Sequence, residues 1–300
     1  MKLPTPIHTI SSLIDAAMES KGEEPRPHLG ASLLGHPCDR WLWLSFRWAV
    51  RERFSGRVLR LFRRGKLEEK QIMEDLRSIG VVFRECEEGQ WQVDFGCHVS
   101  GSLDGVIDHG VPEAPKALHV LEMKTHSLKS FNELESKGVK EDKPQHWCQM
   151  QTYMHGMGID SALYVAVCKD DDRYYTERVR YDREAAEKLI GRGQRIALSD
   201  RLPEPLSVDP SWYQCRFCAA HTFCHDTHLT QEICCRTCAH ATATRASTWT
   251  CARYGNAEIP IEAQREGCDC HVLHPDLVPW KWLDSDDPWT AVYEIDGQAV

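Results

Sequence analysis

Residues 101–124 read GSLDGVIDHGVPEAPKALHVLEMK and contain two apolar segments around which the rest of the chain is organised. Asp104 ends the first segment, and Glu122 and Lys124 end the second. If the segments form neighbouring strands, both carboxylates and the lysine lie at one sheet edge. Carboxylate oxygens suit a hard divalent cation, and a lysine beside it can orient or activate a water. The stretch predicts the active end of a metal-dependent phosphodiesterase; the alternative is a surface hairpin with scattered charges.

The composition indicates a chain with one large core or two smaller ones. Its 300 residues are 42% hydrophobic and 27% charged, which is enough to bury a sizeable interior. No run of about 18 apolar residues is present, and the start MKLPTPIHTI lacks the apolar stretch of a secretory signal. We therefore expect a soluble, cytoplasmic protein without a membrane partner. The formal charge of −9 argues against a surface coated in nucleic acid.

Positive charge is nevertheless concentrated in one segment, residues 47–66. Glu52 is the only acid among Arg47, Arg51, Arg53, Arg57, Arg60, Arg63, Arg64 and Lys66. An acidic protein that concentrates cations in this way is expected to hold a polyanion there. The candidates for contacts with a DNA backbone are Arg57, Arg60, Arg63 and Arg64. The alternative is a solvated helix face whose arginines pair with acidic neighbours elsewhere.

The order of elements predicts an α/β (α+β) core with a mixed central sheet. Helices are expected over 7–21 and 57–80, and short strands over 81–86, 91–95, 97–108 and 117–125. Further helices are expected over 127–138, 144–158 and 182–198, with strands over 162–169 and 173–180 between them. We divide the chain into an N-terminal helix and linker (1–30), the core (31–228) and a cysteine-rich tail (229–300).

Four short motifs, in this order along the chain, resemble those of the PD-(D/E)XK nuclease superfamily. They are Glu69 after Arg-Arg-Gly, Gly-Ser-Leu-Asp104-Gly, Glu122-Met-Lys124 and Gln149-Met-Gln-Thr-Tyr153. The last motif is similar to the Q-x-x-x-Y element of RecB-type and phage-recombination exonucleases. Two positions depart from the family: Leu103 replaces the proline before the aspartate, and Glu69 stands where RecB-type members often have histidine.

The resemblance covers about residues 38–225 and implies a restriction-endonuclease-like core with a metal-dependent active site. Mg²⁺ or Mn²⁺ would be bound by Glu69, Asp104, Glu122 and the carbonyl oxygen of Met123. Lys124 would position a water or stabilise charge on phosphorus. Gln149 and Tyr153 lie four residues apart on one helix face and would help to position the DNA or the lysine; a purely structural pair is the alternative.

Cysteine clusters predict metal sites outside this active site. Nine of the 14 cysteines lie from Cys215 onward, and such clusters in a reducing compartment more often bind metal than form disulfides. Cys215-x-x-Cys218-x5-Cys224 with the distant Cys38 looks like the iron–sulfur staple of AddB-like and CRISPR-adaptation nucleases. The resemblance implies a 4Fe–4S cluster on these four thiolates, and zinc on the same ligands is the alternative.

The tail offers ligands for a second site. The spacing of Cys235, Cys238, Cys251 and Cys268 indicates a structural zinc ribbon, in which His271 can replace one cysteine. Cys234 and Cys270 are expected to be spectators, and free cysteines in a small core are the alternative. The end of the tail, residues 274–289, is rich in Trp and Pro and is expected to pack as an irregular cap whose Trp side chains could also stack on bases.

The expected function is that of a metal-dependent DNA exonuclease, which hydrolyses phosphodiester bonds of linear DNA in recombination, repair or phage DNA processing. A structure-specific endonuclease and a non-catalytic nucleic-acid-binding module with a degenerate core are the alternatives. The chain has no G-x-x-x-x-G-K-[ST] motif, so unwinding would need a helicase partner; a single-strand annealing protein is a second possible partner.

Overall fold

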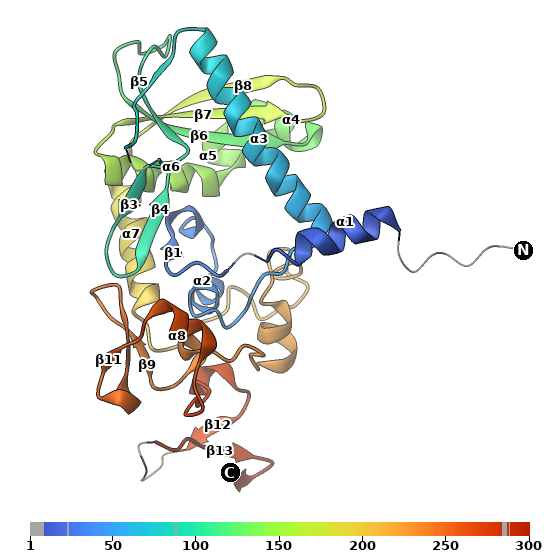
Figure 1. Ribbon diagram of the computed structural model, residues 1–300, viewed down its shortest axis with the longest axis vertical. Coiled ribbons are helices and arrows are strands. Elements are labelled where there is room, and N and C mark those ends of the chain that lie inside the picture. Colours follow the sequence, from blue (N-terminus) through green and yellow to red (C-terminus); the bar gives the residue numbers. More distant parts are fainter. Residues whose placement is uncertain (1–8, 23, 88, 284–286, 288) are drawn as a thin grey trace, which may run out of the picture.

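A five-stranded mixed sheet lies at the centre of the upper half of the molecule (Figure 1). The computed structural model describes residues 9–22, 24–87, 89–283, 287 and 289–300. The strand order is β2-β5-β6-β7-β8, with β6 and β7 parallel and the other neighbours antiparallel. The strands are β2 (Val82–Phe83), β5 (Gly105–His109), β6 (His119–His126), β7 (Ser161–Cys168) and β8 (Tyr174–Arg180). The expected α/β core with a mixed central sheet is confirmed.

Helices cover both faces of this sheet. On one face Ile72 of α3 (Gly56–Ser78) packs with Leu121, Met123 and Val165 of the sheet, and Figure 1 shows α3 crossing the strands. The other face is covered by α4 (Leu128–Lys137), α5 (Val139–Asp142) and α6 (Pro144–Met157). Because both faces are covered, the central strand β7 is an almost uninterrupted apolar run, SALYVAVC.

A second, three-stranded sheet begins where the first one is interrupted. It has the order β1-β4-β3 and consists of β1 (Leu29–Gly30), β4 (Val99–Ser102) and β3 (Gln92–Asp94). The single strand expected over 97–108 is therefore wrong. The chain pairs with β3 up to Ser102, leaves that sheet at Leu103 and Asp104, and joins the central sheet at Gly105. This change of sheet places Asp104 in the gap between two strands.

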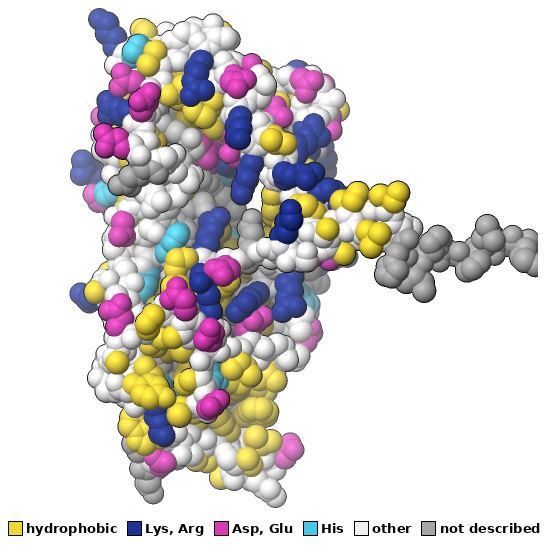
Figure 2. Space-filling view, viewed as in Figure 1, with side chains coloured by type: hydrophobic (Ala, Val, Ile, Leu, Met, Phe, Trp, Pro, Cys, Tyr) yellow, Lys and Arg dark blue, Asp and Glu magenta, His cyan; other side chains and the backbone are white. Residues whose placement is uncertain are grey.

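The N-terminal helix α1 (Ile10–Glu19) packs on the start of α3. Its expected first residues, 7 and 8, lie outside the described residues. Gly56 at the start of α3 allows this close approach, because an added Cβ would lie 2.4 Å from the Asp15 backbone. In Figure 2 hydrophobic atoms cover much of the surface of α1, and the exposed side chains there are Ile10, Leu13 and Ile14.

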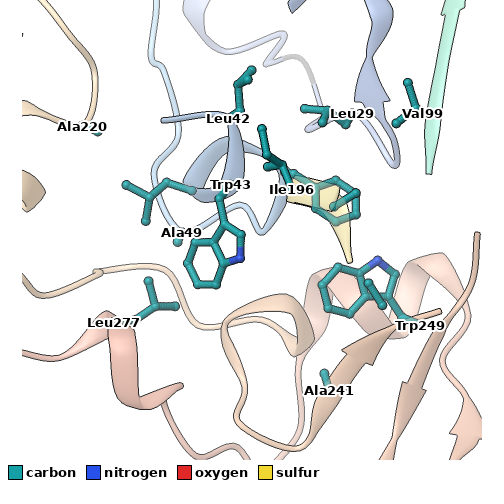
Figure 3. Close-up of a cluster of buried hydrophobic side chains, with 14 of the residues drawn as sticks. Leu29, Leu42, Trp43, Ala49, Val99, Ile196, Ala220, Ala241, Trp249 and Leu277 are labelled. Atoms are coloured by element: carbon teal, nitrogen blue, oxygen red, sulfur yellow. The ribbon is translucent and has the colours of Figure 1, made fainter. Parts of the chain in front are cut away.

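The lower half of the molecule has one apolar cluster that joins the core and the tail (Figure 3). Its members come from α2 (Asp39–Phe46), from α7 (Arg183–Ala197) and from the tail. The tail contains β9 (Ala241–Ala243), β10 (Trp249–Cys251), β11 (Ala257–Glu258) and α8 (Ile261–Glu266). Trp43 of α2, Trp249 of β10 and Leu277 are all buried in this cluster. The predicted division at residues 228 and 229 stays a prediction, but side chains on both sides of it share one interior.

The end of the tail is more regular than expected. Strands β12 (Lys281–Leu283), β13 (Val292–Ile295) and β14 (Gln298–Ala299) form a small antiparallel sheet, so the cap predicted over 274–289 contains a strand. Residues 284–286 and 288 of that cap lie outside the described residues. Among the described residues, no helix is both long and apolar enough to cross a bilayer.

Candidate active site and cysteine clusters

The pairing of β5 with β6 creates the site where the sequence motifs meet. Gly105 pairs with Leu121, so β6 continues past the start of β5 and its next residues have no partner on that side. Asp104 lies at this point, and its Oδ2 accepts a hydrogen bond of 2.8 Å from the amide of Met123. The carboxylate thus replaces the missing strand as a partner for β6. The acids meet at a break beside a central strand rather than at the sheet edge expected from the sequence.

Glu122 and Lys124 lie two residues apart on β6 and therefore share one face of the sheet. Glu122 is fully buried, and burial raises its pKa to about 7, with Asp104 adding to the rise and Lys124 opposing it. The Lys124 ammonium contacts Glu122 Oε1 and donates to the Met123 carbonyl oxygen at 3.2 Å. Burial alone would lower the pKa of Lys124, but the carboxylates of Glu122 and Asp104 raise it above its usual value.

Glu69 lies on helix α3 and reaches the same site from that helix. Burial raises the pKa of its carboxyl, nearby Asp104 adds to the rise, and Lys124 lowers it. The predicted trio of carboxylates, Glu69, Asp104 and Glu122, is thus within mutual electrostatic range. Among the described residues, no three Asp, Glu, His or Cys side chains are arranged at metal-binding distance.

Gln149 and Tyr153 of α6 face the buried acid. Gln149 Nε2 donates to Glu122 Oε2 at 2.9 Å, which occupies the oxygen that Lys124 does not contact. Tyr153 is buried, and burial together with the charges of Glu122 and Asp104 raises its pKa, while a hydrogen bond with Gln149 acts in the opposite direction. The Gln–Tyr pair therefore supports the carboxylate from the helix side.

Gly101 is a supporting residue that motif reasoning missed. A Cβ added to Gly101 would lie 2.9 Å from Tyr153 Cε1 and 3.0 Å from its hydroxyl oxygen. The ring of Tyr153 therefore needs glycine at this position of β4. The only signal in the sequence was the glycine itself, three residues before the aspartate.

A line of buried polar side chains continues from the site and was also missed. His126 follows Lys124 on the same face of β6, and its Nε2 lies 2.9 Å from the hydroxyl of Tyr164. That hydroxyl also lies 2.9 Å from Nδ1 of His146, one turn before Gln149 on α6. Burial lowers the pKa of His126 to about 4 and that of His146 to about 3. Both imidazoles are therefore neutral at pH 7, and they link β6, β7 and α6 behind Glu122.

The basic segment divides into paired and unpaired arginines. Figure 2 shows Lys and Arg side chains along α3, where Arg60 forms an ion pair with Asp15 of α1 and Arg64 donates to the Lys169 carbonyl at 3.1 Å. Arg57 and Arg63 are exposed and form no ion pair within the described part of the chain. Pairing with acidic neighbours, the alternative weighed for this segment, therefore applies to Arg60 but not to Arg57 or Arg63.

Three further arginines of the segment do not lie on α3. Arg51 and Arg53 pair with Glu232 of the tail at 2.9 and 3.5 Å. Arg47 is only 1% exposed, and its guanidinium lies over the rings of Trp43 and Trp249. Its expected place among surface cations is wrong, because the helix α2 that precedes it turns this side chain into the shared apolar cluster.

The four cysteines of the predicted staple line one small pocket, together with His36, Trp41 and His221. Cys38 is the N-terminal cap of α2, and the other three thiols come from residues 215–224. Burial raises the pKa of Cys224 to about 11; Arg40 opposes this shift, and Cys218 and Cys38 add to it. The structure thus places Cys38 in the same pocket as the three later cysteines, and metal binding by the four thiols stays a prediction.

The second cysteine group lies in the tail. Burial raises the pKa of Cys235 to about 11, and the neighbouring thiols of Cys268, Cys238 and Cys251 contribute to the rise. The four cysteines preferred from the spacing therefore lie near one another. His271 instead meets the Thr237 hydroxyl at 3.1 Å, and Cys270 lies 3.9 Å from the hydroxyl of Tyr254.

Comparison with known proteins gives structural likeness only. No family model matches the chain, and no curated protein matches it significantly. The crystal structure of SSO0001 is 12% identical, with 72% of this chain and 96% of that chain covered and a TM-score of 0.43. The alkaline exonuclease LHK-Exo from Laribacter hongkongensis is 18% identical, with 62% of this chain and 90% of that chain covered and a TM-score of 0.39. LHK-Exo in complex with dAMP gives 17% identity, the same coverage and a TM-score of 0.40.

Proposed function

We propose that the chain is a metal-dependent DNA exonuclease that hydrolyses phosphodiester bonds at the break beside β6. The observation that carries the proposal is the set of acids around a half-buried lysine: Asp104 held on the Met123 amide, and the buried Glu122 held between Lys124 and Gln149. These groups come from three separate parts of the chain, namely the turn before β5, strand β6 and helix α6. A surface hairpin, the alternative considered for residues 101–124, has no need for such supporting contacts.

The carboxylates are suited to Mg²⁺ or Mn²⁺ in their oxygen chemistry. Glu69, Asp104, Glu122 and the Met123 carbonyl would hold the cation, which when bound supplies Lewis-acid polarisation of the phosphate and a water of lowered pKa. Burial is the main cause of the raised pKa values of Glu69 and Glu122, and repulsion from the Asp104 carboxylate adds to both. A divalent cation relieves that repulsion.

Lys124 is placed for two roles. Its ammonium is held by Glu122 and by the Met123 carbonyl, and its raised pKa keeps it charged. A charged amine at this position orients a water for attack and stabilises the negative charge that develops on the phosphate oxygens. Gln149 and Tyr153 keep Glu122, and through it Lys124, in position.

The exposed cations Arg57 and Arg63 on α3 are the proposed contacts with the DNA backbone, and Arg60 and Arg64 contribute more weakly because they have protein partners. Phosphate contacts of this kind are independent of base sequence. A non-catalytic binding module would use the same arginines, but it would not require Lys124 to be paired with the buried Glu122.

The catalytic proposal is tested with Asp104→Ala and Lys124→Ala. Both variants should lose Mg²⁺- or Mn²⁺-dependent degradation of linear DNA and keep the wild-type circular dichroism spectrum. The matched control is Asp160→Ala, which removes an exposed carboxylate in the turn between α6 and β7 and should keep full activity. Full activity in both site variants would refute the assignment.

We also propose that Cys38, Cys215, Cys218 and Cys224 hold a 4Fe–4S cluster, with zinc on the same thiols as the alternative, and that Cys235, Cys238, Cys251 and Cys268 hold a structural Zn²⁺. The support is that the distant Cys38 lines one pocket with Cys215, Cys218 and Cys224, and that the thiols of Cys238, Cys251 and Cys268 lie near Cys235. Since metals bind thiolates, the raised thiol pKa values imply that binding releases protons.

Metal analysis decides between the two metals at the first site. Protein purified without oxygen should be brown and absorb at roughly 400 nm, as thiolate-ligated iron does, and the Cys38→Ser variant should lose that colour. A colourless protein that contains zinc alone would establish zinc in place of iron.

A further inference from the structure

A pocket of about 570 Å³ opens directly beside the proposed active site. Asp104 is part of its wall, and the other walls are the end of α3, strand β2 with the loop that follows it, and residues 103–106. Its volume lies within the range of pockets that bind small organic groups, about 300–1,000 Å³. None of the steps proposed for hydrolysis uses this space.

Helix α3 connects the site and the pocket. Glu69, Met73 and Arg77 are spaced four residues apart and therefore lie along one face of the helix. Glu69 belongs to the acidic site, whereas Met73 and Arg77 line the pocket. A substrate strand with its phosphate at Asp104 therefore has its neighbouring nucleotide at the mouth of this pocket.

The lining is chemically distinctive. Phe83 and Trp91 are half-buried, and each packs against a different apolar cluster of the core while also lining the pocket. Phe83 also reaches the residue after Asp104, since a Cβ at Gly105 would lie 4.0 Å from its Cδ1. The pocket therefore offers two aromatic side chains that the folded core holds in place.

One cation in the lining is not neutralised. The Arg77 guanidinium lies 5.0 Å from the centre of the Phe83 ring and forms no ion pair among the described residues. Arg84, by contrast, is paired with Asp108 at 2.9 Å. Aromatic surfaces with one free guanidinium suit a flat, polar ring that carries a phosphate, which is the chemistry of a nucleotide.

We propose that this pocket holds the base of the nucleotide adjacent to the scissile phosphate, stacked on Trp91 and Phe83, with Arg77 beside its phosphate. The inference rests on the proposed nuclease function and extends it. A base inside the pocket cannot be paired, so the enzyme acts on single-stranded or frayed ends and turns over fully paired ends more slowly.

The test uses linear oligonucleotides in which one nucleotide at a time, counted from the cleaved end, is replaced by an abasic residue. Stacking of one base on an aromatic side chain changes affinity by about 5- to 150-fold. One position in the wild-type scan should therefore lower kcat/KM by a factor in that range. In Trp91→Leu the kcat/KM for the intact strand should fall by a similar factor. The kcat/KM for the abasic strand should not fall below its wild-type value, because the stacking contact is already absent.

Two variants control for folding. Trp91→Phe keeps an aromatic face and should keep most of the abasic sensitivity, and Trp282→Leu, which changes a 56% exposed tryptophan of β12, should leave the scan unchanged. Melting temperatures near that of the wild type qualify each variant. An active wild type with no abasic-sensitive position, or a folded Trp91→Leu variant that keeps its sensitivity, would overturn the pocket inference.

Binding separates this inference from the function on which it rests. Anisotropy of labelled strands bound to Asp104→Asn reports stacking without turnover. A protein that hydrolyses nothing yet binds one abasic strand more weakly would overturn the nuclease proposal and retain the pocket. If the protein hydrolyses DNA but its binding and its rates are the same for every abasic position, the nuclease proposal is retained and the pocket inference is overturned. That result would favour a peptide side chain or another ligand in the pocket.

Discussion

Tyr153 depends on the absence of a side chain at Gly101. In Gly101→Ala the new methyl group would lie within 3.0 Å of the Tyr153 ring and of the Ala31 Cβ, so the tyrosine must shift, which disturbs its hydrogen bond with Gln149. Crowding of this kind costs about 1–3 kcal/mol of unfolding free energy, which urea denaturation measures. We expect a lower kcat on DNA as well, because Gln149 holds Glu122.

The control for this change is Gly65→Ala on α3, where an added Cβ meets nothing within 4 Å. That variant should gain about 0.5–1 kcal/mol, since glycine is unfavourable inside a helix, and keep its activity. Equal stability of the two alanine variants would show that Gly101 has room for a side chain.

His98 predicts a loss of stability in acid. It is buried against Phe46 and Trp249, and burial, with the charge of Arg236, lowers its pKa to about 4. Below pH 6.5 the unfolded chain binds a proton that the folded chain excludes, so stability falls as pH drops from 6.5 toward 4. The contribution of His98 between pH 7.5 and pH 5 is about 1–2 kcal/mol.

Urea midpoints of His98→Gln at the two pH values should differ less than those of the wild type. His109→Gln, which changes an exposed histidine, should keep the wild-type difference. If His98→Gln loses as much stability in acid as the wild type, this histidine is not the group that titrates.

Among the elements, α3 carries the proposed contacts with DNA, and its arginines are not equivalent. Arg57→Gln and Arg63→Gln should each weaken DNA binding and reduce the slope of log affinity against log salt by about 1. Arg60→Gln should change the slope less, because Asp15 already neutralises that guanidinium. Anisotropy titrations of Asp104→Asn carrying each change measure the slopes, and unchanged slopes for Arg57→Gln and Arg63→Gln would remove α3 from the interface.

The elements also show what the sequence could and could not predict. The motifs predicted which side chains meet, because Asp104, Glu122 and Lys124 stand next to segments whose apolar pattern indicates strands. The change of sheet at Leu103 and Asp104 was not predictable, since residues 97–108 have one continuous β-type pattern and the break depends on the distant Met123 amide. The burial of Arg47 was not predictable for the same reason, because its partners Trp249 and Arg236 are about 200 residues away in the sequence.

In the molecule as a whole, Arg236 joins the tail to the core. Its guanidinium donates to the carbonyl oxygens of Phe46 and Pro27 and to Gln264 Oε1, and it lies 3.8 Å from the centre of the Trp48 ring. Burial lowers its pKa to about 9, so it remains charged at pH 7. Arg236→Met should lower the unfolding free energy by about 3 kcal/mol, because two buried acceptors and one partly buried acceptor lose their donor.

Calorimetry or urea denaturation measures this loss, and Arg245→Met, an exposed arginine of the same tail, should change stability by less than about 0.5 kcal/mol. A loss confined to the tail, with the core signal unchanged, would mean that the two parts unfold separately although they share the cluster of Figure 3.

The central claim is that acids and a lysine beside β6 make this molecule a metal-dependent exonuclease. The most direct measurement is release of nucleotides from end-labelled linear DNA and from covalently closed circular DNA, with Mg²⁺ or Mn²⁺, by the wild type and by Asp104→Asn. We predict that the wild type degrades the linear DNA, leaves the circle intact and stops when the metal is chelated, and that the variant does nothing. A circle cut as fast as the linear DNA would indicate an endonuclease, and equal activity of Asp104→Asn would contradict the account.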